Sequence, residues 1–112
     1  MKLTYAVDRL FDTGWTPSGE TDLEKLPDGR AFPSVLAVQR EFASAGLELA
    51  IKHNVAFKCF RSTWGPSGET LDSARAGDER HGTVIGACER EAAVYALAQL
   101  REAQAERQMA TV

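Results

Sequence analysis

The sequence WTPSGET at residues 15–21 returns forty-nine residues later as WGPSGET at residues 64–70, with a single difference at the second position. A match that includes a tryptophan and a proline in both copies indicates an internal duplication. A repeat of about fifty residues that occurs only twice predicts one pseudo-symmetric domain, because open solenoids generally need three or more units. We therefore expect residues 1–112 to form a single domain of two repeats, at about 4–53 and 54–107.

The composition is that of an ordinary globular protein. The chain has 112 residues, which is enough for one hydrophobic core and too few for two independent ones. The hydrophobic fraction of 44% and the charged fraction of 26% argue against global disorder. No apolar run approaches the length of a bilayer-spanning helix, and the N-terminus meets Asp8 too soon for a signal peptide. We expect a cytoplasmic protein that does not enter a membrane.

The cysteines and histidines do not have the spacing of a metal site. Cys59 and Cys88 form no Cys-x-x-Cys motif, and His53 and His81 are the only histidines. Reduced, packed thiols are the expectation for such a chain. We predict no structural metal and no cofactor.

A cysteine nucleophile is a weaker interpretation of the same residues. Cys88 stands at the start of a predicted helix, where a thiolate is stabilised, and His81 lies on the strand before it. Glu89 and Glu91 oppose thiolate formation, and no third orienting residue can be named. A small, packed cysteine is the better interpretation.

Two segments are predicted strands because they are rich in β-forming residues. They are Leu3–Phe11 and Val55–Trp64, and each is followed by a long stretch dense in Pro, Ser, Gly, Asp and Glu, at 16–30 and 65–82. These stretches are predicted loops between strands.

Each loop leads into a second predicted strand. His81–Ala87 places Thr, Val and Ile between two glycines, and its counterpart is Ala31–Leu36. Because Pro33 cannot donate to a β-ladder, the first copy should be an edge strand or a shortened one.

A helix is predicted to follow each second strand. From Cys88 onward, Ala93, Leu97 and Leu100 recur at helical spacing. The equivalent segment 38–53 allows two interpretations, because a helix that ended at Gly46 would leave Leu47, Leu49 and Ile51 on one face of a strand. The duplication favours the continuous helix, since Leu47 aligns with Leu97.

Together these elements predict an α+β fold. Two ββα repeats (ββα-ββα) would share a four-stranded, mainly antiparallel sheet, with both helices packed on one face. The opposite face would be open or used for association.

Residues 82–100 resemble the last strand and final helix of double-stranded-RNA-binding domains. The shared pattern is a glycine, a short strand, a second glycine, a small residue and an Ala-rich helix. The family has two lysines at the helix N-terminus, where this chain has Glu89 and Arg90. That difference removes the phosphate-binding argument, so RNA binding is not inferred from the resemblance.

Two candidate sites follow from the repeats. The duplicated loops could hold a small ligand or an enzyme site, with Trp15 and Trp64 stacking on it and Glu20 and Glu69 accepting hydrogen bonds. The competing interpretation is that these residues only close the ends of the sheet.

The second candidate is a basic-aromatic sheet face. Side chains two apart on a strand point the same way, so Arg9 with Phe11 and Lys58 with Phe60 would form a platform for unpaired RNA bases or a dimer interface. The net charge of −3 counts against indiscriminate polyanion binding, although a local basic face is compatible with it. The leading hypothesis is therefore a non-enzymatic interaction module that self-associates as a homodimer, with RNA binding and a small-ligand site as alternatives.

Overall fold

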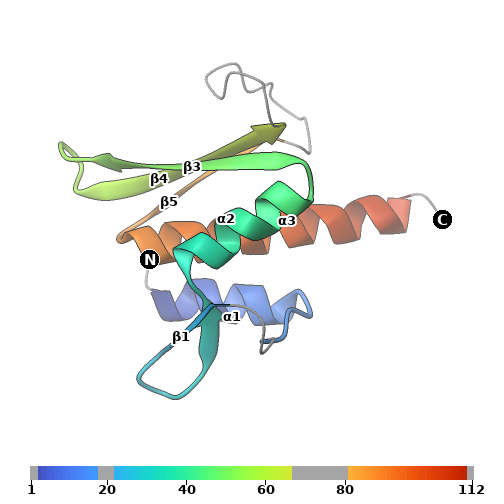
Figure 1. Ribbon diagram of the computed structural model, residues 1–112, viewed down its shortest axis with the longest axis horizontal. Helices are drawn as coiled ribbons and strands as arrows, with labels where there is room; N and C mark the ends of the chain where they lie inside the picture. The colour runs from blue at the N-terminus through green and yellow to red at the C-terminus, as the bar shows by residue number, and fades with distance from the viewer. Residues whose placement is uncertain (1–2, 18–21, 67–80, 111–112) are drawn as a thin grey trace.

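The computed structural model describes residues 3–17, 22–66 and 81–110. These residues form three helices and five strands, in chain order α1 (Leu3–Asp12), β1 (Leu23–Lys25), β2 (Ala31–Pro33), α2 (Val35–Ser44), β3 (Leu47–Asn54), β4 (Cys59–Pro66), β5 (Gly82–Gly86) and α3 (Glu89–Ala110). Strands β1 and β2 pair in one antiparallel sheet, and β3, β4 and β5 pair in that order in a second one (Figure 1).

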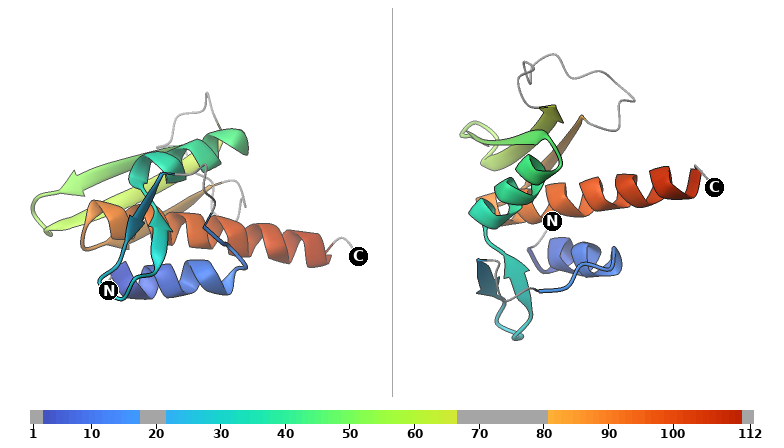
Figure 2. Two further views of the ribbon diagram at one scale, coloured as in Figure 1. Left: turned by 60° about the horizontal axis from the view of Figure 1, so that its bottom comes forward. Right: turned by 45° about the vertical axis from the view of Figure 1, so that its right-hand side comes forward.

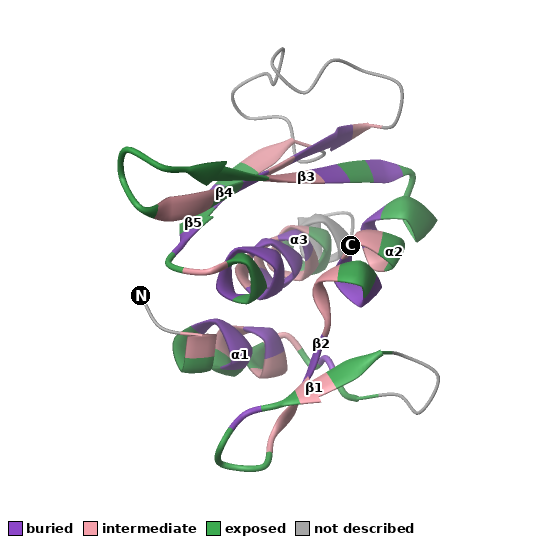
Figure 3. Ribbon diagram, turned by 60° about the vertical axis from the view of Figure 1, so that its left-hand side comes forward, coloured by how far each residue is buried: buried purple, intermediate pink, exposed green. Residues whose placement is uncertain are grey.

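The molecule is layered around α3. Helices α2 and α3 both pack on the same face of the β3–β4–β5 sheet, and α1 packs against α3 on the side away from that sheet (Figure 2). The described residues leave the other face of the sheet uncovered (Figure 3). The prediction of an α+β fold is confirmed, and the sheet face on which the two helices pack has three strands rather than the predicted four.

Buried alanines allow α3 to approach its neighbours closely. Ala92, Ala93, Ala96 and Ala98 are all fully buried. A Cβ atom added to Gly86 of β5 would lie 2.6 Å from the backbone nitrogen of Ala92, so strand and helix are in direct backbone contact there. No helix in the described parts of the chain is long and apolar enough to cross a membrane.

The predicted first strand is a helix. Residues 3–12 form α1, and the residues it turns inward are Leu3, Ala6, Val7 and Leu10. Their spacing of three, four and seven residues places them on one helical face, which buries them against α3. Packing on α3 therefore outweighs the β-propensity of the segment, and the prediction of a strand over Leu3–Phe11 was wrong.

The predicted helix over residues 38–53 ends near its middle. Helix α2 stops at Ser44, and Gly46 follows with a φ of +77°, a left-handed conformation that favours glycine. Beyond it, Leu47 and Leu49 are buried on alternate positions of β3. The interpretation that ended the helix at Gly46 is the correct one, and the continuous helix was wrong.

These corrections remove the predicted symmetry from the described residues. The strand, strand, helix order occurs in residues 23–44 and in residues 59–110, but in the first half of the chain α1 stands where the first strand was predicted and β3 replaces the second part of the predicted helix. Sheets of two and three strands replace the predicted four-stranded sheet. The two repeated tryptophans also differ in setting, because Trp15 follows α1 and Trp64 lies within β4.

Other predictions hold. Residues 82–86 form β5 and residues 89–110 form α3, so the segment that resembles the last strand and final helix of double-stranded-RNA-binding domains has those elements. Strand β2 is short and ends at Pro33, as the missing donor requires.

Strand β1 was not predicted. It lies inside the segment 16–30, which was predicted to be a loop.

Candidate functional site

A tight turn at residues 55–58 joins β3 to β4. The backbone N–H of Phe57 donates to Oδ1 of Asn54 at 3.2 Å, and the N–H of Lys58 donates to the carbonyl of Val55 at 3.3 Å. Lys58 has a φ of +51°. These contacts hold Val55 and Phe57 outside the core, where they are 74% and 79% exposed.

The strands beside this turn place cations on the uncovered sheet face. The backbone register pairs Lys52 with Arg61 and Arg61 with Ile85, so the three residues form one row across β3, β4 and β5. Ser62 beside Arg61 and Val84 beside Ile85 are buried on the face that the helices cover, and the row therefore points the opposite way. Lys52 and Arg61 are exposed, and Ile85 is 57% exposed.

These side chains line an open groove with a cavity volume of about 720 Å³. The residues that line it are Lys52, His53, Asn54, Val55, Phe57, Cys59, Arg61 and Ile85. No acidic side chain is among these described residues. The groove therefore combines apolar surface with positive charge. We call it, together with Lys58 in the adjoining turn, the hairpin groove.

The sequence around the hairpin groove is free of acids. No Asp or Glu occurs between Leu49 and Gly68, whereas Lys52, Lys58 and Arg61 all do. The whole chain has 13 Lys and Arg residues and 16 Asp and Glu residues. The sequence outside this stretch therefore holds ten of the basic residues and all sixteen acids. An acidic protein thus carries one locally basic hairpin.

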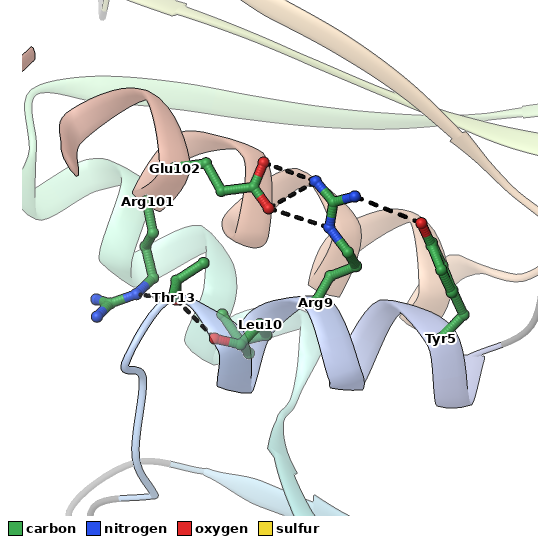
Figure 4. A network of polar contacts seen from close by, with 6 residues as sticks. All are labelled: Tyr5, Arg9, Leu10, Thr13, Arg101 and Glu102. Carbon is green, nitrogen blue, oxygen red and sulfur yellow. Dashed lines mark hydrogen bonds and ion pairs between the residues drawn. The ribbon is translucent and has the colours of Figure 1, made fainter. Parts of the chain in front are cut away.

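Elsewhere, arginines are engaged in structural contacts. Arg9 of α1 donates two hydrogen bonds from Nη2 and one from Nε to the carboxylate of Glu102 on α3, at 2.6 to 3.0 Å, and a longer one to Tyr5 (Figure 4). The hydrogen bond to Glu102 is the main reason that the pKa of Arg9 is raised. Arg101 donates to Thr13 at the end of α1. These contacts join α1 to α3.

Three more arginines form ion pairs. Arg30 pairs with Asp8 and Asp28, Arg40 with Asp22, and Arg90 with Glu24. The pKa of Arg90 is raised, chiefly by its hydrogen bond to Glu24. By contrast, Lys52, Lys58 and Arg61 have no ion pair with any residue in the described ranges. The hairpin cations remain available to a ligand.

The four residues of the predicted basic-aromatic platform do not come together. Arg9 and Phe11 lie on α1, separated from the sheet by α3. Lys58 lies in the hairpin turn rather than in a strand. Phe60 is half-buried, and its ring stacks on His53 with centroids 4.4 Å apart and planes 10° apart.

The sequence interpretation missed the residues that take their place. Phe57 is the exposed aromatic, and Lys52 and Arg61 are the sheet-face cations. The acid-free stretch 49–68 was the signal that pointed to them. The face on which Lys52 and Arg61 lie depends on residues 47–54 being a strand, and the sequence interpretation assigned most of them to a helix.

The two repeated tryptophans belong to the core. Trp15 is 6% exposed and stacks on Phe11, with centroids 5.6 Å apart, while Trp64 is 3% exposed and packs on Phe42 at 5.5 Å. Glu20 and Glu69 lie outside the described residues. The small-ligand site at the duplicated loops stays a prediction.

The structure places Cys88 directly before α3. Cys88 is half-buried, and its Sγ accepts a hydrogen bond from the backbone N–H of Glu91 at 3.4 Å, in the first turn of α3. Within residues 3–17, 22–66 and 81–110, no three His, Cys, Asp or Glu side chains are grouped to hold a metal ion.

Comparisons with protein-family models, with curated proteins and with solved structures found no match. The fold defines a small α+β protein, and its candidate site is the hairpin groove.

Proposed function

We propose that this protein is a non-enzymatic interaction module that binds an anionic partner through the hairpin groove. The observation that carries the proposal is the group of three cations, Lys52, Lys58 and Arg61, that form no ion pair with a described residue. Lys52 and Arg61 line the groove together with exposed apolar side chains, Lys58 lies in the adjoining turn, and the described lining of the groove has no acid. Such a surface attracts negative charge and offers apolar contact area.

The same surface argues against a symmetric dimer through this groove. A twofold interface brings each patch onto its own copy, so Lys52 and Arg61 would face like charges. Like charges that are brought together and desolvated oppose association. The anionic partner is therefore a different molecule.

A homodimer through another surface is a second candidate. In the described residues β5 pairs only with β4, so its outer edge is free to add a strand from a second copy. Sedimentation velocity over a range of protein concentrations tests this candidate. A chain that remains monomeric at high concentration would exclude it.

Heparin chromatography tests the proposed function directly. We expect the wild-type protein to bind a heparin column at low salt in spite of its net charge of −3. The double variant Lys52→Glu/Arg61→Glu should elute at lower salt, because phosphate- or sulfate-like charge is neutralised by these side chains.

The matched control is Lys25→Glu/Arg40→Glu. It changes the net charge by the same amount on β1 and α2, both outside the β3–β4 hairpin, at two exposed positions. Arg40 loses its ion pair with Asp22 in this variant, but a pair so exposed contributes little to stability. Its elution should differ less from that of the wild type than the elution of the hairpin variant does. Failure of the wild type to bind, or an equal loss in the two double variants, would overturn the proposal.

A further inference from the structure

The apolar part of the hairpin groove distinguishes among anionic partners. Phe57, Val55 and Ile85 are 79%, 74% and 57% exposed, and all three line the groove beside the cations. A purely hydrophilic polyanion would use the cations and leave these side chains in water. A partner that alternates charge with flat apolar faces would cover both kinds of surface.

Nucleic acid has that alternation, and its unpaired form presents it best. In a duplex the faces of the bases are stacked inside the helix, where Phe57 cannot reach them. In a single strand each base has a free π-face that stacks on aromatic side chains, while the phosphates meet Lys and Arg. The groove therefore fits an unpaired strand better than a duplex.

The shape of the site also favours a strand of nucleic acid over a lipid surface. The cavity of about 720 Å³ lies along the side of the hairpin and extends to Ile85 on β5. A bilayer is flat on this scale and can cover the protruding turn, but it cannot fill a groove beside it. A flexible single strand of nucleic acid can follow the groove across the sheet.

The turn fixes the backbone that carries the aromatic side chain. The hydrogen bond from the N–H of Phe57 to Asn54 fixes the backbone of residue 57 against β3. Pre-organised contacts lower the entropic cost of binding. Phe57 thus stands on a turn whose backbone is held by hydrogen bonds.

From these observations we infer that the anionic partner is single-stranded nucleic acid, with a base stacked on Phe57 and phosphates on Lys52 and Arg61. The inference rests on the proposed function, since it names the chemistry of the partner that the hairpin groove binds.

The experiment measures binding of a fluorescein-labelled oligouridylate of about 12 nucleotides by fluorescence anisotropy, a length that suits a site of this kind. A blunt duplex RNA of the same length, heparin and vesicles rich in phosphatidylserine are the comparison ligands. Phe57→Ala should weaken binding of the single strand by about 5- to 150-fold, the equivalent of a lost stacking contact. The same variant should elute from heparin at the wild-type salt concentration.

Lys52→Ala should act differently. It should weaken binding of the single strand and of heparin alike, and reduce the slope of log affinity against log salt by about 0.7. Leu36→Ala is the control, because Leu36 is 51% exposed on α2, outside the groove, and it should change neither property.

Each adverse result has a distinct meaning. Heparin retention without binding of the oligonucleotide, binding of the duplex as tight as that of the single strand, preferential binding to vesicles, or wild-type affinity in Phe57→Ala would overturn the inference while the proposed function stands. A lack of binding to heparin and to every other ligand would overturn both.

Discussion

Gly82 of β5 lies directly against the indole of Trp64 on β4, so close that a Cβ atom at residue 82 would overlap the six-membered ring. The ring has little room to move, because it is 3% exposed and packs on Phe42. Glycine is required at this position by space, since its φ is not in the left-handed region.

We therefore expect Gly82→Ala to lower the free energy of unfolding by about 1–3 kcal/mol, the usual cost of an overpacked core. Urea denaturation measures this change. Thr83→Ala is the control at the neighbouring, exposed position, and it should stay within about half a kcal/mol of the wild type. Unaltered stability in Gly82→Ala would mean that the indole moves freely.

The turn from α2 into β3 depends on Gly46. Its φ of +77° is unfavourable for residues with a Cβ atom, although a Cβ atom built on Gly46 would have no other atom within 4 Å. Gly46→Ala should cost about 1–2 kcal/mol through backbone strain alone. Gly46→Asn should cost less, because asparagine tolerates this conformation better. Equal stability of the glycine and alanine proteins, measured by urea denaturation, would contradict this account.

Leu97 anchors α3 in the core. It is 1% exposed, as its helical spacing predicts. Leu97→Ala should lower the free energy of unfolding by about 2–5 kcal/mol, because it removes buried methyl groups and leaves a cavity. Leu36→Ala, at an exposed position of α2, is the control. A loss below about half a kcal/mol in Leu97→Ala would be inconsistent with a core position.

Glu91 is a buried carboxylate near the start of α3. It is 1% exposed, and its Oε1 atom accepts no hydrogen bond from a described residue. Because burying an unpaired polar atom costs about 1–3 kcal/mol, Glu91→Met should raise the stability by a similar amount. Methionine keeps the straight chain and the helix propensity. A lower midpoint in urea would show instead that the carboxylate makes a stabilising interaction.

The sequence alone determined the α+β class and the elements whose local signals agree with their surroundings. In residues 82–100 the two glycines, the β-branched run and the alanine-rich helix specify β5 and α3, and those elements formed as predicted. Pro33 limited β2 in the same way, since the missing donor is a local property.

Tertiary structure decided the parts for which the local signals conflict. Residues 3–11 have β-propensity and a helical pattern of apolar residues, and burial against α3 selects the helix. The duplication of residues 15–21 as 64–70 suggested equal roles for Leu47 and Leu97. Leu47 is instead in a strand, because Gly46 turns the chain toward β4.

The candidate site depends on that same tertiary decision. The sequence shows an acid-free stretch with three cations. The direction in which Lys52 and Arg61 point is set by the pairing of β3 with β4 and by the helices, which cover the opposite face of the sheet. A shift of one residue in the register would turn the opposite side chains of the strand toward the core. Sequence thus supplies the charge of the hairpin groove, and burial of the opposite sheet face by α2 and α3 decides where that charge points.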